Sequence, residues 1–76
     1  MSERDPRVDP RPRDMVRKGN TSRSVLCVWT ARSGHVVVDY KVRGPRRSRK
    51  MYTTIERWSE WCRGAEVVAA AGTEGA

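Results

Sequence analysis

The sequence predicts an α+β fold, a small twisted antiparallel sheet of three to five strands with one C-terminal helix packed on it. Residues 24–30 and 35–42 are rich in β-branched and aromatic residues and flank Ala-Arg-Ser-Gly, which predicts a β-hairpin because Gly34 can adopt a positive φ. An apolar stripe with helical spacing follows at residues 55–65. The two patterns favour one architecture, as expected of a sequence that folds to a single state.

The chain divides by composition into three parts. Residues 1–13 repeat Asp-Pro-Arg and are almost devoid of apolar side chains, which predicts a disordered arm because proline favours extended geometry. Residues 14–68 are expected to form the single compact domain, and residues 69–76, small and glycine-spaced, a flexible tail. The first strand candidate of the domain is residues 14–18, which end at the turn pair Gly19-Asn20.

The two runs of the hairpin differ in their patterning. Residues 24–30 are apolar on both faces, which predicts a central strand covered on two sides. The second run alternates, so one of its faces is expected to be core and the other solvent-exposed. The predicted core residues of this second run are Val36, Val38, Tyr40 and Val42.

Residues 53–65 carry the helix signals. Thr53 and Glu56 have the Thr-x-x-Glu spacing of a capping box, which predicts a helix that runs to Arg63 and stops at Gly64. Residues 65–68 are apolar enough to return as an edge strand. The helical stripe that is expected to pack on the sheet comprises Ile55, Trp58, Trp61, Cys62 and Ala65.

The chain lacks phenylalanine, so its aromatic burial is expected to come largely from its three tryptophans, Trp29, Trp58 and Trp61. Cys27 and Cys62 both fall in apolar stretches and are interpreted as buried thiols, which could pair in an oxidising compartment.

The positive charge is concentrated in one part of the chain. The formal net charge is +7, but residues 15–50 hold ten Lys or Arg against one acid, a net +9, whereas residues 51–76 have a net charge of −2. This separation creates a field that attracts a polyanion. Five of the eight residues 43–50 are cationic, and Gly44-Pro45 interrupts any regular strand there.

An arginine-rich loop suits phosphate oxygens and guanine edges because the guanidinium presents a planar fork of donors. The predicted main contacts are Arg43, Arg46, Arg47, Arg49 and Lys50, with supporting charge from Arg17, Lys18, Arg23 and Lys41. The alternative interpretation is a hairpin loop that charge keeps soluble.

Two resemblances add to these predictions. The order strand, longer hairpin, strand, short helix and short strand is similar to that of small SH3-like barrels, and residues 12–16 resemble their Pro-Gly-Asp-x-Val opening, with Arg13 in place of glycine. Residues 11–68, with Trp58-x-x-Trp61 and residues 63–68 at their end, also resemble small orphan proteins encoded by bacteriophages. The second resemblance implies a phage accessory role without naming a target.

Catalysis is not expected. The serines have only His35 as a partner and no acid is arranged around it, the cysteines and the histidine match no metal spacing, and no cofactor motif occurs. No apolar run approaches the roughly 20 residues that cross a bilayer. Without a hydrophobic leader, a cytoplasmic location is expected, that of the bacterial host if the protein is phage-encoded.

Two functions therefore remain open. The first is a small basic binding module that contacts DNA or RNA through the arginine-rich loop. The alternative is a phage-encoded inhibitor, anti-CRISPR-like or with a host-takeover role, that binds an acidic host protein of a defence or nucleic-acid-handling complex. Charge does not distinguish them, because a surface that binds phosphates also binds carboxylates.

Overall fold

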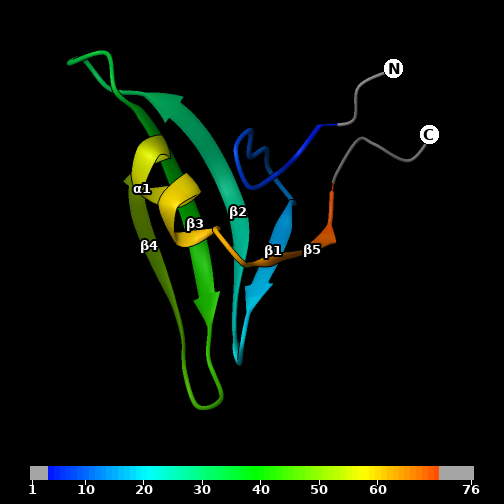
Figure 1. Cartoon of the computed structure of the whole chain (residues 1–76). Helices are drawn as coiled ribbons and strands as arrows, with labels where there is room; N and C mark the ends of the chain where they lie inside the picture. Colours follow the sequence, from blue (N-terminus) through cyan, green and yellow to red (C-terminus); the bar gives the residue numbers. More distant parts are fainter. Residues whose placement is uncertain (1–3, 71–76) are drawn as a thin grey trace.

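The computed structural model describes residues 4–70, which form one open antiparallel sheet and one helix (Figure 1). The elements are β1 (Met15–Lys18), β2 (Thr21–Thr30), β3 (Val36–Arg43), β4 (Ser48–Thr54), α1 (Ile55–Trp61) and β5 (Glu66–Ala69). The strand order is β4-β3-β2-β1-β5. The predicted α+β class and the predicted range of strands are confirmed, but the helix precedes β5 and is not the C-terminal element.

The predicted hairpin is β2–β3. Its loop is closed by a hydrogen bond from Ala31 N to His35 O of 2.8 Å, and Gly34 has the expected positive φ of 93°. β2 is the middle strand, as predicted, and its pairing with β3 shifts register between Val25 and Cys27.

The sheet has two unlike faces. Helix α1 packs against the side that carries Val38 and Tyr40, called here the covered face, and the side that carries Val37, Asp39 and Lys41 is called the open face. The prediction that β2 is covered on two sides is wrong, because Val25 belongs to the buried cluster while Cys27 and Trp29, on the open face, are exposed.

The core lies between α1 and the covered face. The Tyr40 and Trp58 rings meet edge to face, with centroids 5.4 Å apart, and Ile55 and Trp61 are partly buried against the cluster. The predicted packing stripe is thus confirmed, whereas burial of Trp29 is not, since 47% of that residue is exposed. The buried cluster comprises Val16, Val25, Val38, Tyr40, Trp58, Cys62 and Ala65.

The helix begins one residue later than predicted. Thr54 is the N-cap, and its hydroxyl accepts a hydrogen bond of 3.3 Å from Arg57 N. Thr53 lies inside β4, opposite Val38, whereas Thr54 is the last residue of β4 and directly precedes the helix. The helix ends at Trp61, two residues before the predicted end at Arg63, and the turn that follows contains Gly64 with the expected positive φ of 78°. No helix among residues 4–70 is long and apolar enough to cross a membrane.

The N-terminal segment, residues 4–13, contacts the core although its composition predicts a disordered arm. Pro6 is fully buried, and its carbonyl accepts a hydrogen bond of 3.0 Å from Trp58 Nε1. Arg4 forms an ion pair with the buried Asp14, whose carboxylate also accepts from Arg11 N at 2.8 Å. The predicted flexible tail, residues 69–76, falls outside the described residues from 71 onward.

The turn that leads into β1 forms with Arg13 in a glycine-like conformation. Asp14 N donates to Arg11 O at 3.0 Å, Pro12 is the second residue of the turn, and Arg13 has a positive φ of 77°. Proline followed by a positive φ is the pattern of a type II turn. The left-handed conformation costs a side-chain-bearing residue roughly 1–2 kcal/mol, so arginine is tolerated here at some cost in stability.

Candidate functional site

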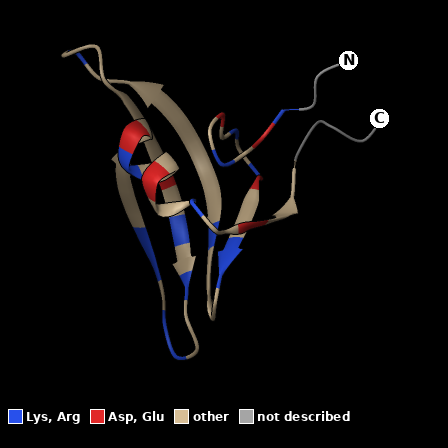
Figure 2. Cartoon of the chain, in the orientation of Figure 1, with Lys and Arg blue, Asp and Glu red and all other residues tan. Residues whose placement is uncertain are grey.

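The basic residues gather at one end of the sheet. In an antiparallel meander alternate turns lie at the same end, so the β1–β2 and β3–β4 turns are neighbours in space. Figure 2 shows Lys and Arg concentrated at this end, whereas Asp and Glu lie mainly on α1 and near the N-terminal segment. The charge separation along the sequence is therefore also a separation in space.

The β3–β4 turn presents the arginine-rich loop. Gly44 N donates to Arg47 O at 2.9 Å and closes the turn, which leaves Arg46 and Arg47 exposed at its tip. No ion pair within residues 4–70 involves any of six cations on β3, β4 and their turn. This set, the basic hairpin end, comprises Lys41, Arg43, Arg46, Arg47, Arg49 and Lys50.

The strand register places these cations on both faces. Lys41 and Lys50 are directly opposite each other on the open face, and Arg49 lies opposite Val42 on the covered face. Like charges in directly opposite positions repel one another. The Lys41–Lys50 pair therefore concentrates positive charge on the open face.

Arg23 is a structural residue rather than an exposed contact. Its guanidinium carbon lies 3.9 Å from the centroid of the Trp61 ring and 4.4 Å from that of Tyr40, within the range of cation–π attraction. Burial lowers its pKa below the ordinary value, and its buried Nε has no hydrogen-bond partner. Arg23 therefore covers the aromatic core.

Arg17 and Lys18 are also engaged within the molecule. Arg17 Nη2 lies 2.8 Å from Glu66 Oε1, in an exposed pair that joins β1 to β5. Lys18 Nζ donates to Trp61 O at 3.0 Å and lies 5.6 Å from the centroid of the same ring. Of the nine residues predicted from the sequence, the structure brings together the six of the basic hairpin end and gives these two and Arg23 intramolecular partners.

Two aromatic residues of the open face are absent from the predicted site. Trp29 is 47% exposed and Tyr52 is 75% exposed. Trp29 Nε1 donates a hydrogen bond of 3.2 Å to Asp39 Oδ1. This bond fixes the N–H edge of the indole against β3, while the ring remains accessible to solvent. The alternation of side chains along the strands identifies both residues as open-face residues. Tyr52 pairs with Asp39 and Trp29 pairs with Val37, and both partners lie on the face away from the core.

The two cysteines are free thiols in different surroundings. Cys62 is buried in the core as predicted, and burial raises its pKa to about 11. Cys27 is exposed, contrary to the prediction, because it lies on the open face. Its Sγ donates to Asp39 Oδ2 at 3.3 Å, and this hydrogen bond to a carboxylate raises the pKa of the thiol. No group of three metal-binding side chains occurs among residues 4–70.

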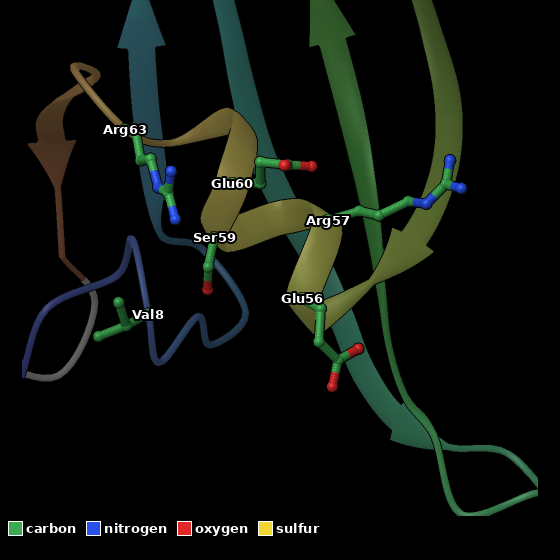
Figure 3. A pocket seen from close by; sticks show the side chains of 6 residues that line it. All are labelled: Val8, Glu56, Arg57, Ser59, Glu60 and Arg63. Atoms are coloured by element: carbon green, nitrogen blue, oxygen red, sulfur yellow. The ribbon is translucent and has the colours of Figure 1, made fainter.

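A shallow hollow lies between the N-terminal segment and the outer side of α1 (Figure 3). Figure 3 shows the Arg57 and Glu60 side chains pointing away from Val8. The hollow thus lacks the converging polar groups of a small-molecule site. Its lining residues are Val8, Glu56, Arg57, Ser59, Glu60 and Arg63.

The candidate site is therefore the basic hairpin end together with the open face beside it. Both are built on paired strands, which hold side chains in a fixed register. Comparisons with protein-family models, with curated proteins and with solved structures found no match for this chain.

Proposed function

We propose that this protein is a small non-catalytic module that binds nucleic acid, with the basic hairpin end as its phosphate-contacting surface. The observation that supports the proposal is the set of six neighbouring cations without an ionic partner within residues 4–70. Charges that stabilise the fold are paired or stacked, as Arg17 and Arg23 are. Cations that serve neither purpose and repel one another are suited to an external polyanion.

The proposal sets a salt dependence. Each phosphate neutralised by Lys or Arg releases counterions, so affinity falls as salt rises. If four of the six cations contact phosphates, the slope of log affinity against log salt is about −3.6 on a duplex and about −2.8 on a single strand. A titration over several salt concentrations measures that slope.

A paired charge reversal tests where binding occurs. Arg46→Glu with Arg47→Glu removes the tip of the basic hairpin end, and we expect affinity for a fluorescent oligonucleotide to fall strongly at low salt. The matched control is Arg57→Glu with Arg63→Glu, which makes the same change in net charge on exposed residues at the helix side. The control should bind nearly as the parent protein does.

Two results contradict the proposal. If both double variants lose affinity equally, the protein responds only to net charge and the basic hairpin end is not the site. If the parent protein binds neither duplex nor single strands at low salt, nucleic acid is not the ligand.

A second candidate is the phage-encoded inhibitor, because the charge separation of Figure 2 also suits an acidic groove on a host protein. Nuclease treatment before purification distinguishes the two. An acidic host protein that remains bound in stoichiometric amount after this treatment, and that R46E/R47E releases, would favour inhibition over nucleic-acid binding.

A further inference from the structure

The open face offers more than charge, and we propose that it is a stacking platform for the unpaired bases of a single-stranded nucleic acid. Trp29 and Tyr52 would contact the bases, while the basic hairpin end holds the phosphates. This inference rests on the proposed function and specifies which form of nucleic acid is bound.

The strand register aligns the relevant side chains on one face. One row across the sheet contains Cys27, Asp39 and Tyr52. The adjacent row contains Trp29 opposite Val37. The two aromatic residues therefore occupy neighbouring rows, two strands apart.

Trp29 is already oriented for stacking. Its backbone pairs with Val37, yet its Nε1 reaches Asp39, two residues further along β3, so the indole extends along the sheet. Val37 is only 8% exposed although it is on the open face, which is consistent with cover from its cross-strand neighbours. Orienting the ring before binding reduces the entropy lost when a base stacks on it.

Tyr52 is 75% exposed, which is unusual for a large aromatic residue within a strand. Its neighbour Met51 is on the covered face and Tyr52 is on the open face, so its ring does not contribute to the core. An exposed aromatic side chain on a rigid strand has a face available for any base, and base stacking on such rings tolerates all sequences.

The cations lie on one side of the aromatic rows. The row after Asp39 and Tyr52 contains Lys41 and Lys50, and the next contains Arg43. Successive rows on one face are roughly 7 Å apart, because each strand residue advances about 3.4 Å. Bases over Trp29 and Tyr52 would thus have their phosphates near these cations.

Asp39 adds a negative charge next to the aromatic residues. Its carboxylate accepts hydrogen bonds from Trp29 and Cys27, and its negative charge disfavours a phosphate beside the aromatic rings. The phosphates are therefore directed towards Lys41 and Lys50, while the base edges, which carry N–H donors, can approach Asp39. The face is thus polarised for a ligand with a flat neutral part and an anionic part.

A duplex does not fit this arrangement, because its base faces are covered by their neighbours in the stack. A protein partner fits less well, since lysine is depleted from the centres of protein interfaces and Lys41 and Lys50 occupy the row next to that of Tyr52. Single-stranded nucleic acid uses both the rings and the charges.

The test compares ligands that differ only in their bases. The probes are a fluorescent oligothymidylate of about 12 nucleotides, within the usual site size, an abasic phosphodiester of equal length, and a duplex. We expect the thymidylate to bind tightest. Replacing Trp29→Val and Tyr52→Thr should weaken thymidylate binding by roughly 5- to 150-fold for each stacked base and leave abasic binding unchanged.

The control is Met51→Thr, which alters the exposed residue next to Tyr52 in β4, on the covered face opposite Tyr40. It should bind thymidylate as the parent does, and circular dichroism should show every variant folded. A second readout is tryptophan fluorescence, since stacking on Trp29 should quench its emission and W29V should abolish that part of the quenching.

The outcomes separate the two proposals. The stacking platform is refuted, and the basic hairpin end stands, if R46E/R47E loses binding while W29V/Y52T binds thymidylate like the parent. The same conclusion follows if the abasic probe or the duplex binds the parent protein as tightly as thymidylate does. If no probe binds at low salt, both proposals fail. Self-association that W29V/Y52T disperses would also refute the platform, because the face would then bind a second copy of the chain.

Discussion

Replacing Trp58 by phenylalanine tests how the N-terminal segment is attached to the core. Trp58 is fully buried, contacts Tyr40 edge to face, and donates to Pro6 O at 3.0 Å. Trp58→Phe keeps an aromatic ring in the core but removes the hydrogen bond that this side chain donates to Pro6 O. The change therefore isolates the tie between residues 4–13 and α1.

The expected cost has two parts. A buried carbonyl without a partner costs about 1–3 kcal/mol. The lost ring atoms add about 1 kcal/mol of burial. The sum, about 2–4 kcal/mol, is a large fraction of the roughly 4–11 kcal/mol expected for a domain of this size. The melting temperature should fall by about 4–8 °C for each kcal/mol. Trp58→Ala is less informative, because its cost of about 3–5 kcal/mol leaves little folded protein to measure.

Urea denaturation followed by circular dichroism measures the free energy of unfolding without relying on tryptophan emission. The control is Trp29→Phe, the same replacement at an exposed ring whose hydrogen bond to Asp39 is at the surface, with an expected cost under about 1 kcal/mol. Trp58→Phe should also speed proteolysis within residues 4–13. Equal stability losses in the two variants would refute the tie, and the disordered arm predicted from composition would then be the better description.

Three further predictions follow from single residues. Arg13→Gly should raise the free energy of unfolding by about 0.5–1 kcal/mol, because it relieves a positive φ, whereas Arg11→Gly should lower it; a destabilised R13G contradicts the turn. A thiol reagent should label Cys27 but not Cys62 in the folded protein, and Asp39→Asn should accelerate labelling by letting the pKa of Cys27 fall; an unchanged rate contradicts the hydrogen bond. The pKa of Cys62 is raised from 9.0 to about 11 in the folded protein, so the unfolded chain loses the thiol proton at lower pH. The free energy of unfolding should therefore fall as pH rises from 9.0 to about 11, and Cys62→Ala should remove this contribution to the pH dependence.

Periodicity was sufficient to predict most of the elements. The alternation of residues 35–42 indicates which side of β3 meets the core, and the spacing of Trp58 and Cys62 identifies the side of α1 that packs there. The short apolar pattern of residues 65–68 predicts an edge strand, and β5 forms one at Glu66–Ala69, one residue later than predicted. These signals are local, so the sequence alone carries them.

The features that the sequence did not reveal depend on contacts between distant residues. β2 is apolar on both faces, so its pattern does not tell which face α1 covers, and Trp29 was therefore expected in the core. Arg23 resembles the other cations in the sequence, but the register places it over Trp61. Pro6 looks like part of a disordered arm until Trp58, 52 residues away, provides a donor for its carbonyl.

The edge position of β4 has a consequence for self-association. An edge strand exposes unpaired backbone donors and acceptors that a second chain can extend into a continuous sheet, and charged side chains are a common safeguard against this. β4 begins with Ser48, Arg49 and Lys50, and β5, the opposite edge, has only four residues. Neutralising Arg49 and Lys50 would therefore remove a barrier to intermolecular strand pairing. The same cations that are proposed to hold phosphates would also keep the protein monomeric when no ligand is bound.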